Sequence, residues 1–516
     1  MSAPLPRWLD PLPDAAAQRA LDGWAIEQRG IPGIELMERA GRGLFELVQR
    51  RLPTGTIAVV CGKGNNGGDG LVVARLLRDA GREVDVHLVC DPSELRGDAR
   101  VNLERLPGSP PRVFNPGALF EVAGIVDAVL GTGAGGAPHG LIGDAVETIA
   151  EAAVHGVPVV ACDVPSGVDG STGEVAGAAV RAVATATFHA AKPGLWIAPG
   201  KGRAGEVAVV DIGIPVDGRP PETAPRAGLI GAAVIGELPH RGAEATKFDG
   251  GAVLVCGGST GLSGAPSLAA LAAARAGAGY VTALVPASLN VVFELRQAEV
   301  MSVPLPEEDG ALVPAALDLA LERCARADAL VLGPGLGRSD GAGALARALA
   351  VEAPVPLLLD ADGLNAHAGR LEELAARTAP TVLTPHGGEL ARLLDVGGDE
   401  VRARRLSLAR QAAMRSGAIV VLKGDDTLVA TPEGAVGISR GDAPALATAG
   451  TGDVLSGTIG ALLARGVEPF TAACAGVELH RRAGQLVGER IGVEGALAGD
   501  VADALPAARR MAAEVG

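Results

Sequence analysis

Aromatic residues are scarce in this sequence, which has one Tyr, three Trp and seven Phe among 516 residues. Proteins that bind single-stranded nucleic acids stack the bases on aromatic side chains and attract the phosphates with basic grooves. This chain instead has 45 Lys and Arg against 60 Asp and Glu, and its net charge of −15 repels phosphate backbones. The composition therefore argues against a nucleic-acid-binding protein.

Cysteines are also few, and long apolar runs are lacking. The six cysteines are scattered without a CxxC pair, which indicates neither a disulfide framework nor a zinc site. No uncharged apolar stretch reaches about 18 residues, and the N-terminus lacks a basic segment followed by an apolar one. We therefore expect a reduced, soluble, cytoplasmic protein that binds no membrane. We also expect a homo-oligomer, although the acidic, aromatic-poor composition gives no indication of its interface.

Lysine is scarce as well. Arg dominates the 45 basic residues, which together with abundant Ala and Gly is typical of a GC-rich genome. Under that codon bias, a lysine that remains can mark a position at which arginine would not serve. The five lysines are Lys63, Lys192, Lys201, Lys247 and Lys423. All except Lys201, which we expect on a surface turn, lie in or beside the motifs described below.

What the sequence does contain is apolar residues, 48% of the chain, enough for buried cores and incompatible with a disordered protein. After a segment with helical spacing (14–51), short apolar runs alternate with helical stretches. Continuous runs of this kind are typical of strands buried on both faces of a parallel sheet. The alternation predicts an α/β fold with two doubly wound domains. Expected strands are 56–61, 84–90, 124–130, 157–164, 206–212, 251–256, 280–285, 327–332, 355–360, 380–384 and 418–423.

The best candidate for a linker is the Pro-rich polar segment 213–226, which shows no periodicity. We place the N-terminal domain at 1–215, the linker at 216–226 and the C-terminal domain at 227–516. Gly-rich loops follow several predicted strands in both domains. Ligands of open parallel sheets bind at the carboxyl ends of the strands, so we expect these loops to form the sites. Single glycines can equally close helices and turns.

In the N-terminal domain, VCGKGNNGGDG (60–70) follows a strand and opens a helix. The amides of such a loop and the positive end of the helix can hold phosphate, although the P-loop pattern is absent. Further segments follow in order: VDAVLGTGAGG (126–136), CDVPSGVDG (162–170), FHAAKPG (188–194) and VVDIGIP (209–215). Together with GIPGIELMERAG (30–41), the set resembles the NAD(P)H-hydrate epimerase family over residues 10–215. The resemblance implies a Rossmann-like domain that interconverts the R and S epimers of NADHX and NADPHX, the hydrates of the reduced cofactors.

The same resemblance implies roles for individual residues. Asp163 would lie at the reacting nicotinamide end and relay a proton, and Lys192 would stabilise negative charge nearby. A helix cap for Asp163 and a surface position for Lys192 are the structural alternatives. The potassium ligands would be Asn66, Asp127 and Ser166, whose oxygens suit a hard monovalent cation. The implied substrate contacts are Asn65, Asn66, Gly67, Gly68, Asp69, Gly131, Thr132, Gly133, Ala134, Gly135, Gly136, Ala137 and Asp163.

In the C-terminal domain, TAGTGDVLSG (448–457) places Gly450 and Gly452 before Asp453 and an apolar helix. Amides at the start of that helix can hold phosphate oxygens, and a carboxylate there can deprotonate a hydroxyl. Negative charge beside a phosphate is unfavourable, so Asp453 indicates proton transfer, with helix capping as the structural alternative. IVVLKGDDT (419–427) is a strand followed by a lysine and a turn, a combination suited to a polyphosphate.

GTGD before an apolar helix resembles the ribokinase-like superfamily. The segments LVLGPGLG (330–337), LLLDADGLN (357–365), LTPHGGEL (383–390) and LKGDDT (422–427) narrow the resemblance to the ADP/ATP-dependent NAD(P)H-hydrate dehydratases, over residues 240–510. Such enzymes phosphorylate the hydroxyl of the S hydrate from a nucleotide with Mg²⁺ and then eliminate phosphate to regenerate NAD(P)H. Because bacterial members use ADP and eukaryotic ones ATP, the Arg-rich fused chain suggests ADP.

The resemblance assigns residues here too. Asp453 would be the general base, and amides of Gly450 and Gly452 would stabilise the charge that develops. Asp360, Asp362 and Asn365 can order Mg²⁺-bound water or the nucleotide, or can simply form an Asp-Gly turn. The implied substrate contacts are Ala265, Gly335, His386 and Asp453. The implied nucleotide contacts are Lys423, Gly424, Asp425, Asp426, Thr427, Gly450 and Gly452.

Two segments depart from the family pattern. HKGxxG has become TKFDGG (246–251), where Thr246 and Phe248 replace the His and the first Gly, so the resemblance no longer supports phosphate contacts from that loop. HPGE has become HGGE, a milder change. GTGD is intact, so we expect both activities. One alternative is a small-molecule kinase of the hydroxymethylpyrimidine or sugar type, which LTPHGGEL argues against. The other is a non-catalytic N-terminal domain that senses nucleotides or binds proteins, which the intact GNNGGDG and DVPSG argue against.

Overall fold

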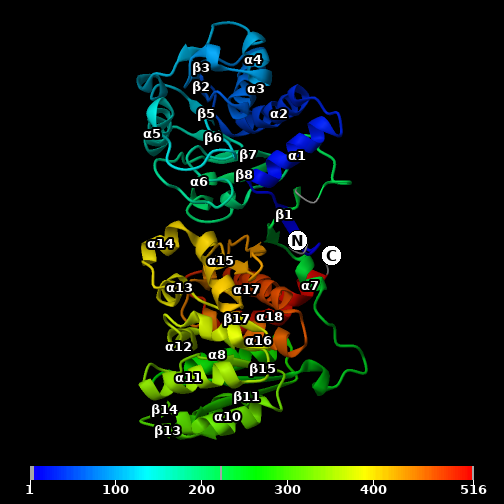
Figure 1. Cartoon of the computed structure of the whole chain (residues 1–516), viewed down its shortest axis with the longest axis vertical. Helices are drawn as coiled ribbons and strands as arrows, with labels where there is room; N and C mark the ends of the chain where they lie inside the picture. Colours follow the sequence, from blue (N-terminus) through cyan, green and yellow to red (C-terminus); the bar gives the residue numbers. More distant parts are fainter. Residues whose placement is uncertain (1–4, 221–222, 514–516) are drawn as a thin grey trace. The chain divides into compact units, whose positions relative to one another are not determined.

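The computed structural model describes residues 5–220 and 223–513, which form two compact α/β units (Figure 1). One unit is Pro11–Ala227, and the other runs from Gly228 onward and includes the N-terminal residues up to Asp10. Both are built on largely parallel sheets with helices on either side, so the predicted fold class of two doubly wound α/β domains is confirmed. Within the described residues, no helix combines the length and the apolar character needed to cross a membrane.

The N-terminal unit contains a sheet of seven strands in the order β4-β3-β2-β5-β6-β7-β8, and all its pairs are parallel. Because the order reverses between β2 and β5, the loops that follow these two strands diverge and leave room for a ligand. The strands are β2 (Ile57–Cys61), β3 (Val84–Leu88), β4 (Arg112–Val113), β5 (Gly124–Ala128), β6 (Val159–Cys162), β7 (Ala184–Phe188) and β8 (Glu206–Val210). The longer helices are α1 (Ala15–Glu27), α2 (Gly33–Arg51), α3 (Asn65–Asp79), α4 (Gly97–Glu104) and α5 (Gly140–Val154).

The central strand β2 shows why an unbroken apolar run forms a strand here. Ile57, Val59 and Cys61 belong to the core shared with α2 and α3, whereas Ala58 and Val60 belong to the core shared with α5. Successive side chains of a strand point to opposite faces, so a strand covered on both faces needs apolar residues at every position. The continuous apolar pattern of residues 57–61 is therefore the one that a strand covered on both faces requires.

The C-terminal unit contains a sheet of eleven strands in the order β1-β9-β20-β19-β18-β17-β16-β15-β10-β11-β12. The pairs from β18 to β12 are parallel, β19 is antiparallel to both of its neighbours, and the strand order reverses between β10 and β15. The strands are β1 (Leu9–Leu12), β9 (Ala227–Ile230), β10 (Ala252–Cys256), β11 (Tyr280–Pro286), β12 (Met301–Leu305), β15 (Ala329–Leu332), β16 (Leu357–Leu359), β17 (Thr381–Leu383), β18 (Ile419–Leu422), β19 (Leu428–Ala430) and β20 (Val436–Ile438).

Helices α8, α16, α17 and α18 share one core with the valines of the central strands, among them Val253, Val255 and Val331. The intervening Leu254 and Leu332 are equally buried but lie outside that core, as alternation along a strand requires. The helices named below are α8 (Gly264–Ala276), α12 (Ala361–Asn365), α13 (Gly387–Leu394), α14 (Gly398–Ala403), α15 (Arg405–Ser416), α16 (Thr451–Ala464), α17 (Pro469–Ile491) and α18 (Ala498–Ala513).

Strand β1 does not join the sheet of the N-terminal unit, although the sequence analysis placed residues 1–215 in one domain. It pairs with β9 at the edge of the eleven-stranded sheet, and the carboxylate of Asp10 forms an ion pair with Arg440. The four residues of β1, LDPL, contain no apolar run that would mark a strand. The assignment of one activity to each domain stays a prediction at this point.

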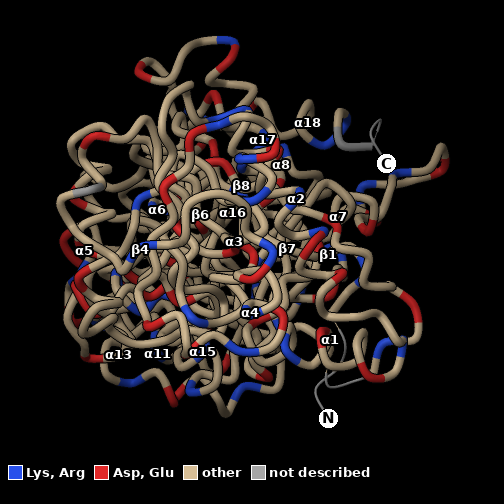
Figure 2. Tube along the Cα trace, turned by 90° about the horizontal axis from the view of Figure 1, so that it is seen from above, with Lys and Arg blue, Asp and Glu red and all other residues tan. Residues whose placement is uncertain are grey.

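Acidic and basic residues are interspersed along the trace rather than separated by sign (Figure 2). Many form pairs one helical turn apart, such as Arg100 with Glu104 and Arg326 with Glu322. Exposed pairs of this kind contribute at most about 1 kcal/mol to stability. Charge alone therefore does not mark a ligand site, and the sites have to be found from buried groups.

Candidate active sites

The first site lies at the carboxyl ends of β2, β5 and β6, where the strand order of the N-terminal sheet reverses. Helix α3 begins there with Asn65, and the backbones approach so closely that glycine is required. A Cβ on Gly67 would overlap the carbonyl oxygen of Gly62, and a Cβ on Gly62 would overlap that of Val129. These contacts bring the predicted substrate segment Asn65–Asp69 next to the loop that follows β5, which holds Gly131–Ala137.

Lys192 and Asp163 form a buried ion pair in this site. Lys192 is 1% exposed, and its Nζ lies 2.8 Å from Asp163 Oδ1. Nζ also donates hydrogen bonds to Thr187 Oγ1 at 3.0 Å and to the carbonyl oxygen of Phe188 at 2.9 Å. Thr132 donates to Asp163 Oδ2 from its backbone N at 2.9 Å and from Oγ1 at 2.5 Å. Lys192 is thus not the surface lysine of the structural alternative.

Burial alone would raise the pKa of Asp163, but the charge and hydrogen bond of Lys192 and the hydrogen bonds of Thr132 outweigh it and lower the pKa. Asp163 is therefore an ionised base at neutral pH. Its φ of 64° lies in the left-handed region, which costs a non-glycine residue about 1 kcal/mol or more. The carboxylate is held by Thr132 and Lys192, and no helix begins at Asp163.

The three predicted potassium ligands meet beside Leu130. Leu130 N donates to Ser166 Oγ at 2.9 Å, and Asn66 Nδ2 donates to the carbonyl oxygen of Leu130 at 2.9 Å. The carboxylate of Asp127, which is 0% exposed, accepts from Ser166 N at 2.8 Å and from Ser166 Oγ at 2.6 Å. Burial raises the pKa of Asp127 to about 6.

No ion pair to Asp127 occurs among the residues that the structure describes, so its buried negative charge lacks a cationic partner. A bound cation would satisfy that requirement. The described residues contain no cluster of three or more His, Cys, Asp and Glu side chains suited to a metal. One carboxylate among neutral oxygens fits a weakly charged cation such as K⁺ rather than a transition metal.

Two further carboxyls belong to this site, and the sequence analysis missed one of them. Asp22 of α1 accepts a hydrogen bond from Gln18 Nε2 at 2.9 Å, and burial raises its pKa, with Lys192 and Asp163 acting in opposite senses. Asp69 is 7% exposed, and its pKa is raised well above the usual value by burial and then by the charges of Asp163 and Asp22. Burial and these charges therefore favour the protonated form of Asp69, whereas Lys192 favours the ionised form of Asp163. Asp22 was missed because it is a single Asp in a helical segment and stands outside the recognised motifs.

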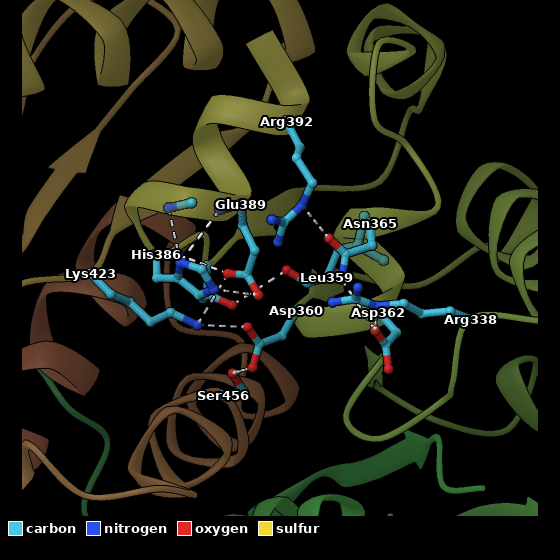
Figure 3. Close-up of polar contacts among 12 residues, drawn as sticks. Arg338, Leu359, Asp360, Asp362, Asn365, His386, Glu389, Arg392, Lys423 and Ser456 are labelled. Carbon is cyan, nitrogen blue, oxygen red and sulfur yellow. Dashed lines mark hydrogen bonds and ion pairs between the residues drawn. The ribbon is translucent and has the colours of Figure 1, made fainter. Parts of the chain in front are cut away.

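The second site lies at the carboxyl ends of β16, β17 and β18, where Asp360, Glu389 and Lys423 point toward one another (Figure 3). Lys423 Nζ lies 2.9 Å from Asp360 Oδ1 and 3.7 Å from Glu389 Oε2. Ser456 of α16 donates to Asp360 Oδ2 at 2.7 Å. The sequence analysis quoted the segments that hold Glu389 and Ser456 but gave neither residue a role, because their contacts with Lys423 and Asp360 depend on how distant segments pack.

Asp453 lies in the first turn of α16 but does not cap that helix. The cap residue is Gly450, whose φ of 91° suits glycine alone and which makes no side-chain capping bond. The pKa of Asp453 is raised to about 7 by burial and by the charges of Asp360 and Glu389, against the opposing charge of Lys423. A carboxyl that titrates near neutral pH is matched to general-base work.

The side chains of His386 and Asp362 both form hydrogen bonds within their own surroundings rather than with Lys423. His386 Nδ1 accepts hydrogen bonds from Gly388 N at 3.0 Å and Glu389 N at 3.4 Å, so this side chain caps α13. Its pKa is lowered by burial and then by nearby cations, so the ring is neutral. Asp362 lies on the far side of Asp360 from Lys423 in Figure 3, where it accepts from Gly337 N at 3.0 Å and from Asn365 Nδ2 at 3.1 Å. Asp360 thus contacts Lys423, whereas Asp362 contacts the end of the GPGLG segment through Gly337.

A cavity of about 350 Å³ opens beside Lys423 and the start of α16. Two of the predicted nucleotide contacts, Asp426 and Gly450, do not line it, and the carboxylate of Asp426 pairs with Arg405 Nε at 2.9 Å. Both the ammonium of Lys423 and the amides of α16 are positive, which suits phosphate. The lining residues are Lys423, Gly424, Asp425, Thr427, Ser439, Gly441, Ala443, Pro444, Leu446, Ala447, Thr451, Gly452, Leu455, Val477, His480 and Arg481.

The remaining predicted substrate contacts lie where the strand order of the larger sheet reverses. A Cβ on Gly335, which follows β15, would lie 3.3 Å from the Cβ of Ala265, which is at the start of α8. Ser259 Oγ donates to the carbonyl oxygen of Gly335 at 3.0 Å and so joins the segment after β10 to the segment after β15. Helix α8 packs against α16, whose first turn carries Asp453.

The TKFDGG segment lies at the other edge of the sheet, because it directly precedes β10. Lys247 Nζ lies 5.0 Å from the ring centroid of Tyr280, the first residue of β11, and 5.7 Å from that of Phe248. Lys63 is an exposed residue 3.3 Å from Glu94. Of the four lysines that the sequence placed beside motifs, only Lys192 and Lys423 lie within the two sites.

Comparisons with known proteins show the family of the chain. A family model described as NAD(P)H-hydrate dehydratase matches residues 253–507, and one described as YjeF-related protein N-terminus matches residues 33–194. A bifunctional NAD(P)H-hydrate repair enzyme of Moorella thermoacetica is 41% identical over 95% of each chain. This chain belongs to the family of bifunctional NAD(P)H-hydrate repair enzymes.

Another member, from Salinibacter ruber, is 40% identical and covers 98% of this chain and 96% of its own. A solved structure, the ADP/ATP-dependent NAD(P)H-hydrate dehydratase of Bacillus subtilis co-crystallised with ATP and Mg²⁺, is 28% identical, with a TM-score of 0.48 over 55% of this chain and 98% of its own. The predicted family and the two predicted enzyme activities are confirmed. The alternative of a sugar or pyrimidine kinase is wrong.

The pKa of Asp453 sets an expectation for the pH dependence of dehydration. A base must be ionised to accept a proton, so kcat/KM for NADH formation should fall about tenfold per pH unit below about pH 7. Lys423 lowers this pKa, so Lys423→Met should move the acid limb to higher pH at saturating nucleotide, whereas Lys201→Met should not. A rate that stays constant down to about pH 5 would contradict the assignment of Asp453 as the base.

Proposed function

We propose that the C-terminal unit phosphorylates the hydroxyl of the S hydrate and then eliminates phosphate. Asp453 takes the proton of the hydroxyl, whose oxygen attacks the β-phosphorus of ADP as AMP leaves. The phosphate then departs with the electrons of its C–O bond, and the adjacent ring carbon loses a proton so that the C=C bond of NAD(P)H forms. The observation that supports this proposal most is the position of Asp453 in the first turn of α16, where burial raises its pKa to about 7 and the charge of Lys423 acts on it.

The charge of this cluster supports a divalent cation. Asp360, Glu389 and Asp453 carry three negative charges when ionised, against the single positive charge of Lys423. Asp360 would hold Mg²⁺ together with the nucleotide phosphates, as one or two carboxylates do in other phosphoryl-transfer sites. The ion would neutralise charge on the transferred phosphoryl group. ADP rather than ATP stays the proposed donor.

Lys423→Arg tests the role of the lysine at constant charge. The ammonium lies 3.5 Å from the position that a Cβ of Gly452 would occupy, so a longer, planar guanidinium would crowd the phosphate position. We expect the KM for ADP in NADH formation to rise by about tenfold. Lys201→Arg is the matched control, because Lys201 lies in the other unit. A silent Lys423→Arg substitution would show that the scarcity of lysine carries no functional information.

We propose that the N-terminal unit interconverts the R and S hydrates by reversible loss of water. Asp69 gives its proton to the hydroxyl at the hydrated carbon, which leaves as water, and the ring nitrogen stabilises the cation that remains. Asp163 then takes a proton from the water that adds to the opposite face. Lys192 keeps Asp163 ionised until that step, and return of the proton from Asp163 to Asp69 through solvent restores the site. The buried ion pair of Lys192 with Asp163, and the opposite directions in which the site shifts the pKa values of Asp69 and Asp163, support this mechanism.

We further propose that Asn66, Asp127 and Ser166 bind K⁺ in the N-terminal unit. Replacing KCl by choline chloride at constant ionic strength should lower the thermal midpoint of this unit and slow epimerisation, because Asp127 loses its cation. In the Asp127→Asn variant, the midpoint should no longer respond to K⁺. A wild-type midpoint that is the same in both salts would argue against the site.

A further inference from the structure

The nucleotide cavity contains no Phe, Tyr or Trp among its lining residues. Adenine is an aromatic ring, and its binding sites usually offer a flat or apolar surface on each face of the ring. One wall of this cavity is apolar, formed by the segment that includes Ala443, Pro444 and Leu446. The opposing surface therefore has to come from a residue of another kind.

Helix α17 contributes three of the residues that line the cavity. Val477, His480 and Arg481 all line the cavity, and their spacing of three and four residues places them on one face of the helix. Burial lowers the pKa of His480 to about 4, so this ring is neutral and adds no charge. Arg481 is the only cation on this face of α17, and its side chain is 12% exposed.

The guanidinium of Arg481 is held in a fixed plane. Its Nε lies 2.7 Å from Glu478 Oε2 and its NH2 lies 2.8 Å from Glu478 Oε1, a two-point contact with a carboxylate that is 1% exposed. NH1 points to the carbonyl oxygen of Gly441 at 3.5 Å. The same carboxylate accepts from Arg482 Nε at 2.7 Å, but Arg482 does not line the cavity.

This geometry decides which part of a nucleotide Arg481 can meet. Arginine frequently binds a phosphate through two parallel N–H···O bonds, and the edge made of Nε and one terminal nitrogen is one of the edges that can supply them. In Arg481 that edge is occupied by Glu478, so the flat face of the guanidinium and NH1 remain available. A planar guanidinium stacks well on an aromatic ring. The phosphate end of the cavity already has its cation in Lys423.

We propose that Arg481, positioned by Glu478, forms one face of the base site and stacks on the adenine of the bound nucleotide. The inference rests on the proposed assignment of this cavity to ADP. It makes Arg481 a residue that sets nucleotide affinity through the base. Glu478 acts through Arg481 and is a positioning residue.

The test compares three ligands on the full-length protein by isothermal titration calorimetry: ADP, adenosine and inorganic pyrophosphate. Arg481→Met keeps the apolar length of the side chain, and the buried charge of Glu478 stays paired with Arg482. We expect the Kd for ADP and for adenosine to rise by about tenfold, with the Kd for pyrophosphate within about twofold of wild type. Arg482→Met, which removes the other partner of Glu478, should leave all three values near wild type.

Other outcomes overturn the proposal in distinguishable ways. An equal loss of affinity for pyrophosphate would show that Arg481 contacts phosphate instead of the base. Equal effects of Arg481→Met and Arg482→Met would show that both act only through the packing of α17. ADP binding that does not respond to Lys423→Ala would overturn the assignment of the cavity to ADP itself, and the role of Arg481 with it.

Glu478→Gln separates positioning from stacking. The amide keeps the shape of Glu478 but weakens the two-point contact, so the guanidinium loses its fixed orientation. We expect a smaller loss of adenosine affinity than in Arg481→Met and no additional loss in the double variant, because both act on one contact. Additive losses would contradict the positioning role.

Discussion

Asp453→Asn should lower the rate of NADH formation from S-NADHX by about a thousandfold while epimerisation continues at the wild-type rate. The amide cannot accept the proton of the attacking hydroxyl, and it keeps the volume of the carboxyl at the start of α16. The measurement is the absorbance of NADH formed from purified S-NADHX with ADP and Mg²⁺. Epimerisation is followed separately by chromatographic separation of the R and S hydrates.

The matched control is Asp399→Asn, which makes the same change of charge at an exposed residue of α14 (93% exposed). It should leave both activities unchanged. Loss of both activities in a folded Asp453→Asn protein would refute the assignment of dehydration and epimerisation to separate units. Retention of more than about a tenth of the dehydratase rate would show that Asp453 is not the general base.

Asp163→Asn should abolish epimerisation and leave the dehydration of pure S-NADHX intact. The substitution removes the base and also leaves the ammonium of Lys192, 1% exposed, without its ionic partner. Removing one member of a buried pair typically costs about 3–5 kcal/mol, so the thermal midpoint of the N-terminal unit should fall as well. Circular dichroism melts and the chromatographic epimer assay measure the two effects.

A double variant separates loss of catalysis from loss of stability. Asp163→Asn combined with Lys192→Met leaves no unpaired charge in the pocket, so the melting midpoint should recover. Epimerisation should stay absent, because the base is still missing. Recovery of activity together with stability would mean that Asp163 serves only the fold of the N-terminal unit.

The arrangement of motifs was predictable because of sheet geometry. Asn66, Asp127 and Asp163 lie at or just after the ends of β2, β5 and β6, and the carboxyl ends of parallel strands lie on one edge of a sheet. The same rule brings Asp360 and Lys423 together in the second unit. Continuous apolar runs such as residues 57–61 marked the buried strands for the same physical reason, since both of their faces are covered.

The electrostatic environment of each site was not predictable in this way. That Lys192 is buried, that burial raises the pKa of Asp69 and that Asp22 of α1 acts on that pKa all depend on packing between segments far apart in the sequence. Strand β1 was missed because its four residues pair with an edge strand more than 200 positions away. The sequence analysis placed Lys247 of the TKFDGG segment beside the functional motifs, whereas the position of this segment before β10 puts it at the opposite edge of the sheet.

The central claim is that one chain repairs both hydrate epimers. The most direct measurement supplies purified protein, ADP and Mg²⁺ with an equal mixture of R- and S-NADHX and follows the absorbance of NADH. The account predicts a single continuous recovery of all the NADH, faster than the epimers interconvert without enzyme, and loss of its second half in Asp163→Asn. Recovery that stops at the S epimer in the wild-type protein would contradict it.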